Sequence, residues 1–355
     1  MANTRGVTAV AERPTDTVRL STLSSPRIAS TSDLLPAVRP AADVNRTARA
    51  ALGVLSGLPG AVTDMAVSHD GRQLVAAHYG DDTVSVIDVS TLSVSATVSG
   101  IAEPYAVATA DRAYVNSASD VDDTVVAIDL KAGAALAAKE ITVGARGLAV
   151  SPDGTALYVA RSGDQVADIA VIDVESGKCK TIAVTRTVDD WVDTVRINAD
   201  GTRLYAALNT DTGGSLVVID VRARRVLHTV ALGGSIGDIA VDRDNRRVLV
   251  TGWDDELGGV VRVVDATAGR VVDTIVVDGL PVQLVASGTT AYLVDSYGIA
   301  VIDTSAARVV DHIDTESPVS CIAVSRDGSR LFVADYDGAI AAIEVSKAQE
   351  LRAAS

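Results

Sequence analysis

The side chains in this 355-residue chain that could do chemistry recur at two fixed places in a repeated pattern. The first place lies just before a short apolar run, where carboxylates, a thiol and a phenol occur. The second lies just after the following apolar run, where imidazole, guanidinium, indole and carboxylate groups occur. Together the two places supply the candidate ligand-binding residues Asp64, His78, Tyr79, Tyr105, Arg146, Arg161, Asp193, Trp253, Asp295, Cys321, Asp335 and Tyr336.

Four of these residues, Asp64, His78, Asp295 and Asp335, have side chains that could bind a divalent metal ion. Carboxylate oxygens suit Ca²⁺ or Mg²⁺, whereas the imidazole favours a transition metal. An ion held there could polarise a lactone carbonyl and activate a water molecule. The plainer interpretation is that these are solvated loop side chains, so no cofactor is certain. Cys321 with His78 and an aspartate has the composition of a nucleophilic set, but nothing local to Cys321 activates its thiol.

These positions belong to a sevenfold internal repeat. Each repeat contains an apolar run that ends in Ile-Asp or a close variant, and the spacings between the terminal acidic residues are 41, 44, 47, 45, 38 and 41. A period of this length is typical of a four-stranded propeller blade. We expect the shared aspartates to cap the turn between the third and fourth strands rather than to bind a ligand. The acidic residues are Asp88, Asp129, Asp173, Asp220, Asp265, Asp303 and Glu344.

The third repeat shows the blade most clearly. Residues 148–151, 156–160, 169–173 and 179–184 read as strands A, B, C and D, counted outward from the centre of the ring. Asp153-Gly154 makes the tight turn between A and B, because Asp and Gly tolerate positive φ. The strands are almost continuously Val, Ile, Leu and Ala, as expected for sheets that pack on both faces.

The repeat predicts an all-β fold, a seven-bladed β-propeller with four-stranded antiparallel blades over residues 46–350. The last repeat supplies only three strands, so we expect residues 47–55 to close it as the outermost strand. Residues 1–45 are rich in Thr, Ser, Pro, Ala and Arg without periodicity, which predicts a disordered tail. The predicted blades are 64–104, 105–145, 146–191, 192–235, 236–280, 281–318 and 319–350 with 47–55.

The phrases AVSPDGTALYVA (149–160) and AVIDVESGK (170–178) resemble YVTN-type repeats. From about residue 47 onward the chain resembles the bacterial YncE-like, YVTN-repeat β-propellers, which are related in fold to lactonase-like seven-bladed propellers. The resemblance implies a seven-bladed ring with any ligand site at the mouth of the central channel. Some relatives hydrolyse sugar lactones, so the resemblance also implies a metal-assisted, lactonase-like hydrolase on blades 6, 7 and 1 as an alternative function.

Both candidate places should face one end of the ring, because strand A is innermost and begins on the face that carries the loops between strands B and C. Arg146, Arg161 and Asp193 would then lie on blades 3 and 4, where arginine could bind a ligand carboxylate or phosphate, or form an inter-blade salt bridge. Trp253 lies among carboxylates and suits a partner surface or a cationic ligand, or a rim position folded onto its blade.

Composition narrows the function classes. The net charge is −15, and because residues 1–50 carry a net charge of +3, the remainder carries −18, which disfavours nucleic acid as a partner. No apolar stretch is long enough to span a membrane, the N-terminus lacks a signal-peptide core, and two cysteines in different repeats favour a reduced, cytoplasmic location. We therefore expect a scaffold that binds a small molecule or a protein at the mouth of the channel.

Overall fold

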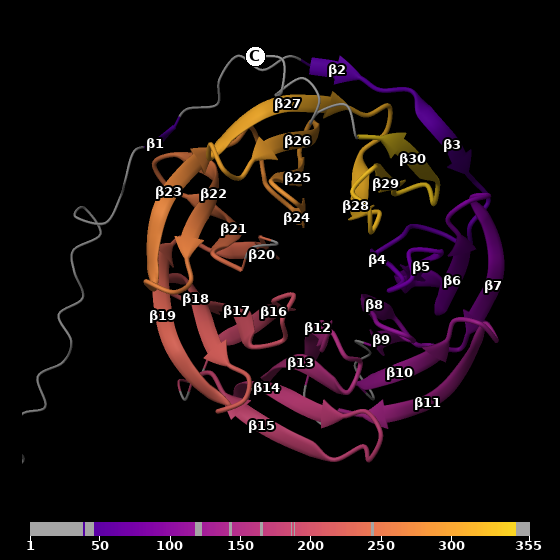
Figure 1. Cartoon of the computed structure of the whole chain (residues 1–355), viewed down its shortest axis with the longest axis horizontal. Coiled ribbons are helices and arrows are strands. Elements are labelled where there is room, and N and C mark those ends of the chain that lie inside the picture. The colour runs from indigo at the N-terminus through magenta and orange to yellow at the C-terminus, as the bar shows by residue number, and fades with distance from the viewer. Residues whose placement is uncertain are drawn as a thin grey trace, which may run out of the picture. The chain divides into compact units, whose positions relative to one another are not determined.

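The computed structural model describes residues 38–39, 46–117, 123–141, 144–163, 166–185, 187, 189–242 and 245–345, which belong to one compact unit. Within these residues the chain forms β-strands and one 3₁₀ helix, η2 (Tyr79–Asp81), and no α-helix. The strands make seven sheets arranged around a central axis (Figure 1). The predicted all-β, seven-bladed β-propeller with four-stranded antiparallel blades is therefore confirmed.

The innermost strands, A, surround the axis, and each contacts the A strands of the two neighbouring blades. Strand B pairs with strand A in every blade. The A strands are β4 (Asp64–Val67), β8 (Pro104–Thr109), β12 (Ala145–Val150), β16 (Trp191–Ile197), β20 (Ile236–Val241), β24 (Gln283–Ser287) and β28 (Val319–Val324). The B strands are β5 (Gln73–His78), β9 (Ala113–Ser117), β13 (Ala156–Gly163), β17 (Arg203–Thr210), β21 (Arg247–Asp254), β25 (Thr290–Asp295) and β29 (Arg330–Asp335).

The outer half of each blade consists of strand C and strand D. The C strands are β6 (Thr83–Asp88), β10 (Thr124–Asp129), β14 (Val166–Asp173), β18 (Gly213–Asp220), β22 (Gly258–Asp265), β26 (Gly298–Asp303) and β30 (Ile340–Glu344). The D strands are β7 (Ser93–Ser99), β11 (Ala134–Glu140), β15 (Cys179–Ala183), β19 (Arg225–Gly233), β23 (Arg270–Val276), β27 (Arg308–Asp314) and β3 (Ala51–Leu55).

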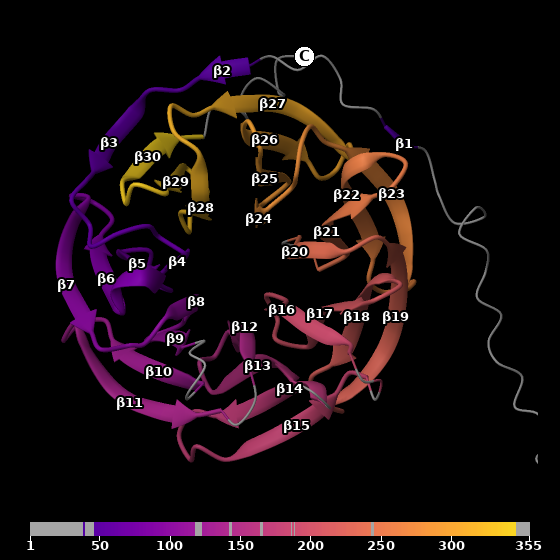
Figure 2. The same ribbon diagram turned by 180° about the vertical axis from the view of Figure 1, so that it is seen from behind.

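An N-terminal strand closes the last blade, as predicted. β3 pairs antiparallel with β30, so blade 7 is built from both ends of the chain (Figure 2). The strand is shorter than expected, because Arg46–Ala48 forms β2 and pairs in parallel with β27 of blade 6 instead. Arg49 anchors the crossing between the two blades with an ion pair to Asp311 at 2.7 Å. The chain thus runs along the outer edge of blade 6 before it reaches blade 7.

The segment predicted to be a disordered tail, 1–45, lies mostly outside the described residues. Its described part is β1 (Val38–Arg39), which pairs in parallel with β23 of blade 5. N-terminal strands therefore lie at the outer edges of three blades. β1 pairs with the D strand of blade 5, β2 pairs with the D strand of blade 6, and β3 is itself the D strand of blade 7. Covering these edges protects their unpaired backbone groups from pairing with other chains.

Aliphatic side chains join each blade to the next. Ile169 of blade 3 and Val195 of blade 4 belong to one buried cluster, and Phe332 of blade 7 and Leu74 of blade 1 belong to another. A cluster of this kind fills each of the seven junctions, including the one where the ring closes. The sheets are buried on both faces, which explains their continuous apolar runs.

The antiparallel order gives the ring two different ends. We call one the turn end, where the A–B and C–D turns lie, and the other the loop end, where the B–C and D–A loops lie. At the turn end, the Oδ1 atom of Asp88 accepts hydrogen bonds from the N–H groups of Ser90 and Thr91, at 2.9 and 3.0 Å. With the Ser90 hydroxyl, these bonds lower the pKa of Asp88 to about 2. Asp129, Asp173, Asp220, Asp265 and Asp303 accept equivalent bonds, which confirms the predicted capping role.

Candidate binding site

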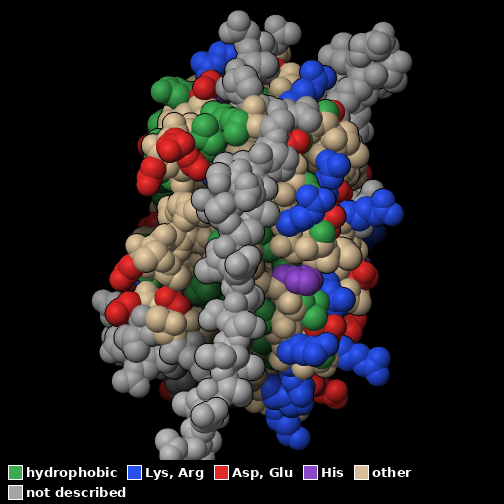
Figure 3. Space-filling model, turned by 90° about the vertical axis from the view of Figure 1, so that its left-hand side faces the viewer, with side chains coloured by type: hydrophobic (Ala, Val, Ile, Leu, Met, Phe, Trp, Pro, Cys, Tyr) green, Lys and Arg blue, Asp and Glu red, His purple; other side chains and the backbone are tan. Residues whose placement is uncertain are grey.

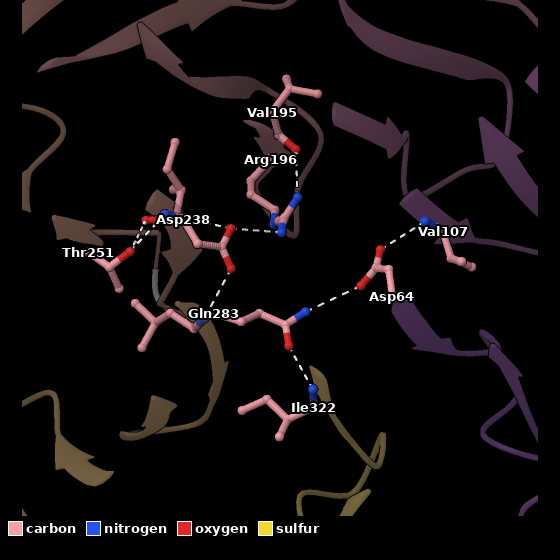
Figure 4. Close-up of polar contacts among 10 residues, drawn as sticks. Asp64, Val107, Val195, Arg196, Asp238, Thr251, Gln283 and Ile322 are labelled. Atoms are coloured by element: carbon pink, nitrogen blue, oxygen red, sulfur yellow. Dashed lines mark hydrogen bonds and ion pairs between the residues drawn. The ribbon is translucent and has the colours of Figure 1, made fainter. Parts of the chain in front are cut away.

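Polar side chains of the A strands meet at the axis and link neighbouring blades (Figure 4). The Oδ2 atom of Asp64 accepts a hydrogen bond from the Val107 N–H of blade 2 at 2.8 Å. The Oδ2 atom of Asp238 accepts one from Leu284 of blade 6 at 3.0 Å. The Oε1 atom of Gln283 accepts one from Ile322 of blade 7 at 2.6 Å. Residues at the same position of strand A in blades 1, 5 and 6 thus each accept a hydrogen bond from a backbone N–H of the following blade.

Two side-chain contacts join these links into one network. Arg196 of blade 4 donates to the Oδ1 atom of Asp238 at 2.8 Å, and the Nε2 atom of Gln283 donates to the Oδ1 atom of Asp64 at 3.3 Å. Protein surrounds the Asp64 carboxyl at the axis, and this burial raises its pKa to about 6. We interpret the network mainly as a device that holds blades 4 to 7, 1 and 2 in register.

Tyr105, Arg146 and Asp193 lie near the start of strand A in blades 2, 3 and 4. Partial burial raises the pKa of Tyr105, the charge of Arg146 opposes the shift, and the charges of Asp193 and Asp64 add to it. Asp193 accepts a hydrogen bond from the Asn209 amide at 2.8 Å. Arg146 is exposed and forms no ion pair with another described residue. The predicted grouping of Arg146 and Arg161 with Asp193 therefore stays a prediction.

The four candidate metal ligands are not brought together as one group. Among the described residues there is no group of three or more His, Cys, Asp or Glu placed to hold an ion. Both ring nitrogens of His78 are hydrogen-bonded, to the Gly60 carbonyl at 3.0 Å and the Ser85 hydroxyl at 2.9 Å. Asp295 contacts His312 instead, at 3.2 Å. The hydrolase alternative therefore has no support in the arrangement of these residues.

Local contacts give three of these side chains, His78, Asp295 and Asp335, a role in the fold. Burial lowers the pKa of His78, as expected for a core imidazole kept neutral. The Oδ1 atom of Asp335 accepts hydrogen bonds from the N–H groups of Asp337 and Ala339, which closes the B–C loop of blade 7. Asp295 similarly accepts one from Tyr297 at 2.8 Å. These carboxylates shape their loops.

Two further candidates, Arg161 and Cys321, are engaged in contacts within the fold. Arg161 forms a bidentate ion pair with Asp168, at 2.7 and 2.9 Å. The two residues face each other on neighbouring strands of blade 3, so the expected inter-blade salt bridge is an intra-blade one. Cys321 is buried in the junction between blades 7 and 1, and burial raises the pKa of its thiol well above the ordinary value. It therefore lacks the activation that a nucleophile needs.

Exposed aromatic side chains gather at the loop end. Tyr79, Tyr105, Trp253 and Tyr336, predicted as site residues, all lie there and are 41%, 41%, 43% and 61% exposed. Tyr297, which is 59% exposed, was not predicted. It occupies the B–C loop of blade 6 just as Tyr336 occupies that of blade 7, so comparison of the two loops could have found it. The sixth exposed aromatic residue, Trp191, begins strand A of blade 4 at the same end.

The loop end is also acidic. Between the strands at this end, the described residues include twelve carboxylates and no Lys or Arg, whereas the turn end carries both signs. Seen from the side, Lys and Arg gather toward one end of the ring (Figure 3). The loop-end carboxylates are Asp81, Asp82, Glu103, Asp123, Asp189, Asp190, Asp211, Asp255, Glu256, Asp278, Glu316 and Asp337.

Known proteins share this architecture. The chain is 34% identical over 321 residues to the seven-bladed beta-propeller protein Rv1057 of Mycobacterium tuberculosis, with 79% of this chain and 81% of that one covered. Residues 51–88 and 306–341 match the WD domain, G-beta repeat. A structure of Kuenenia stuttgartiensis hydrazine synthase is similar in fold, with a TM-score of 0.73 at 20% identity, covering 82% of this chain and 97% of that chain. Within the described residues, no helix could cross a membrane.

Proposed function

The chain belongs to the family of seven-bladed β-propeller proteins, and we propose that it is a binding scaffold whose loop end docks a basic protein partner. The observation that carries this proposal is the joint placement of exposed aromatic and acidic side chains at one end. Six of the eleven aromatic residues are exposed, and all six lie at the loop end, in or next to its loops. Tyr and Trp at such positions are the side chains that most often anchor protein interfaces.

Charge selects the class of partner. The described residues of these loops include twelve carboxylates and no Lys or Arg, and this negative charge attracts a cationic surface and repels an anionic one. Trp253 is followed by Asp254, Asp255 and Glu256, so an arriving Lys or Arg would meet an indole face and a carboxylate together. Aromatic anchors would supply most of the affinity, and the carboxylates would supply steering and selectivity.

A binding experiment with a defined probe tests this proposal. The probe is poly-L-lysine of about 20 residues, titrated calorimetrically at low and at physiological salt. We expect the double variant Asp255→Lys, Glu256→Lys to weaken binding about tenfold, and Trp253→Ala with Tyr336→Ala to weaken it several-fold. The matched control, Asp111→Lys with Glu175→Lys, makes the same charge change in exposed residues of the turn end. Equal weakening by the two charge-reversed pairs would overturn the proposal.

The axis offers a second candidate at the same end, a small ligand with a carboxylate or phosphate group. Its support is Arg146, which is exposed, unpaired with any described residue, and close enough to Tyr105 to affect its pKa. Such a ligand would lose affinity in Arg146→Ala and keep it when Trp253 and Tyr336 are replaced. The two candidates are therefore distinguishable with the same set of variants.

Within the seven-bladed propellers we propose the YVTN-repeat, YncE-like group, on the strength of the strand–turn–strand phrases at 149–160 and 170–178. We also propose a cytoplasmic location. Cys179 and Cys321 are both free thiols, which fits a reducing compartment. Fractionation of the native host, followed by detection of the chain, tests this location.

A further inference from the structure

A groove of about 540 Å³ lies at the turn end, on the junction between blades 7 and 1. Its walls are the A–B turns of both blades and the start of the C–D turn of blade 1. The two A–B turns are so close that a Cβ atom on Gly71 would lie 3.4 Å from the Cβ of Arg326. This is the junction at which the ring closes, and the groove faces away from the loop end.

Three arginines line the groove: Arg72, Arg326 and Arg330. Arg330 donates to the Val89 carbonyl of blade 1 at 3.3 Å, which holds its guanidinium across the junction. The guanidinium of Arg326 forms a hydrogen bond with the imidazole Nδ1 of His69, at 3.1 Å, and with no other described residue. Arg72 is exposed, and its guanidinium forms no hydrogen bond or ion pair with another described residue. Most of the donors of the three guanidinium groups are therefore uncommitted.

The three carboxylates in the same groove are hydrogen-bonded within their own turns. Asp327 accepts three hydrogen bonds on its Oδ1 atom, from the Ser325 hydroxyl and from the N–H and hydroxyl of Ser329. Asp88 accepts four of the same kind in the C–D turn, and Asp70 accepts two in its own turn. These hydrogen bonds lower the pKa of all three groups, so the carboxylates stay ionised and are held in place by their own turns.

Closing the turns does not require the arginines. At the position of Arg326 the A–B turns of blades 3 and 4 carry Pro152 and Ala199, and at the position of Arg72 they carry Thr155 and Thr202. In these turns the aspartate likewise accepts a hydrogen bond from the N–H two residues further on. The arginines at the closing junction are therefore additions to a turn that folds without them.

We propose that this groove binds a small organic anion whose phosphate or carboxylate group is held between Arg72 and Arg326, with Arg330 at the base. Guanidinium forks match the geometry of both groups. The groove has the size of ordinary small-molecule sites, which are about 300–1,000 Å³. The hydroxyls of Ser90 and Ser329 border it and would serve the neutral part of the ligand.

Calorimetric titration of the full chain with inorganic phosphate, glucose 6-phosphate and citrate tests the proposal and separates its two ligand chemistries. We expect at least one probe to bind, and Arg72→Ala with Arg326→Ala to weaken it by about tenfold or more. The pair Arg72→Lys, Arg326→Lys keeps the charge but loses the fork, so we expect an intermediate loss. Melting temperatures check that the variants fold.

A control gives the test its meaning. Arg246→Ala changes an exposed arginine at the position of Arg72 in blade 5. This variant should leave binding to the groove unchanged. Binding that is absent for all three probes, or that survives in Arg72→Ala, Arg326→Ala, overturns the proposal. The poly-L-lysine titration concerns the loop end, so either proposal can fail without the other.

Discussion

The two ends of the ring use aspartate in opposite ways. At the turn end, Asp88 and Asp153 accept hydrogen bonds from their own turns, and the same bonds recur from blade to blade. At the loop end, Asp255 and Glu256 occupy a B–C loop whose sequence matches that of no other blade. Residues that recur in a repeat protein hold the fold, whereas residues that vary between equivalent loops are available for binding.

Aromatic residues divide in the same way. Five of the eleven, including Tyr205 and Phe332, are buried in strands, and the other six are exposed at the loop end. The groove at the junction of blades 7 and 1 lies where the turns vary, because Arg72 and Arg326 stand at positions that carry other residue types in blades 3 and 4. Variation between equivalent turns is informative, as it is between loops.

The largest expected effect comes from opening the ring on which both ends depend. Deleting residues 1–56 removes β1, β2 and β3 and leaves blade 7 with three strands and an open edge at β30. We expect the melting temperature to fall by about 10 °C or more, because an entire strand and its pairing are lost. Differential scanning calorimetry measures the change.

Deleting residues 1–40 is the matched control, since it keeps β2 and β3 and, of the described strands, removes only the short β1. We expect its melting temperature to stay within about 2 °C of the full chain. If the two truncated proteins melt together, strand β3 does not close the ring. In that case the loop of Tyr336 and the groove of Arg326 would also be less rigidly placed than described above.

A second prediction concerns pH, because Asp64 at the axis and the aspartates of the turn end affect stability in opposite directions as the pH changes. The pKa of Asp64 is raised from 3.8 to about 6, so its contribution favours folding below 3.8 and is lost as the pH rises through 6. The turn-end aspartates Asp88 and Asp327, with pKa values of about 2, act in the opposite sense: their contribution is present above 3.8 and is lost as the pH falls through 2.

The variant Asp64→Asn removes this titration. Comparing it with wild type therefore isolates the contribution of Asp64 to the unfolding free energy between pH 4.5 and 6.5. We expect wild type to lose about 1–2 kcal/mol of unfolding free energy relative to the variant across this window. Urea denaturation of both proteins at both pH values measures this loss. Subtracting the variant from wild type cancels the contributions of His78 and His312, which both proteins share. A difference that does not change with pH would mean that the Asp64 carboxyl is well solvated.

The fold could be predicted from the sequence because its determinants are local and repeated. The spacing of the terminal aspartates and the Asp-Gly turns predicted the blades, and the missing strand in the last repeat predicted closure by an N-terminal strand. The register of that strand could not be predicted, because β2 pairs with blade 6 through backbone groups that any sequence can supply. Arg49 and Asp311, which fix the crossing, are 262 residues apart.

The site was predicted less well, because side-chain pairing depends on contacts between distant residues. His78 was expected beside a cavity, but its two ring nitrogens find Gly60 and Ser85 inside blade 1 and the loop before it. Arg161 and Asp168 are seven residues apart on facing strands, so this pair could have been found by aligning the hairpin. The side chains just before strand A were predicted as ligand-binding residues, and their role in joining blades could be seen only in the structure.

A third prediction compares one aspartate from each end. Asp153→Ala removes the acceptor for the Ser151 hydroxyl and for the N–H and hydroxyl of Thr155, so we expect a loss of about 1 kcal/mol. Asp255→Ala, an equally exposed change in the loop end, should stay within about 0.5 kcal/mol of wild type. Chemical denaturation of both variants measures the contrast. Equal losses would show that the loop-end carboxylates also serve the fold.

The smallest effect is expected from divalent ions. Both ring nitrogens of His78 are hydrogen-bonded, and Asp295 and Asp335 accept hydrogen bonds from their own loops. These side chains are therefore engaged in the fold and are not arranged around an ion. We expect the melting temperature of metal-stripped protein to change by less than about 1 °C with Ca²⁺, Mg²⁺, Mn²⁺ or Zn²⁺, whereas an ion at a hundred times its dissociation constant would add about 2.7 kcal/mol. A clear rise that Asp335→Ala abolishes would place an ion among the loop-end carboxylates. Those carboxylates would then be committed to a metal, and the loop end would no longer present free negative charge to a basic partner.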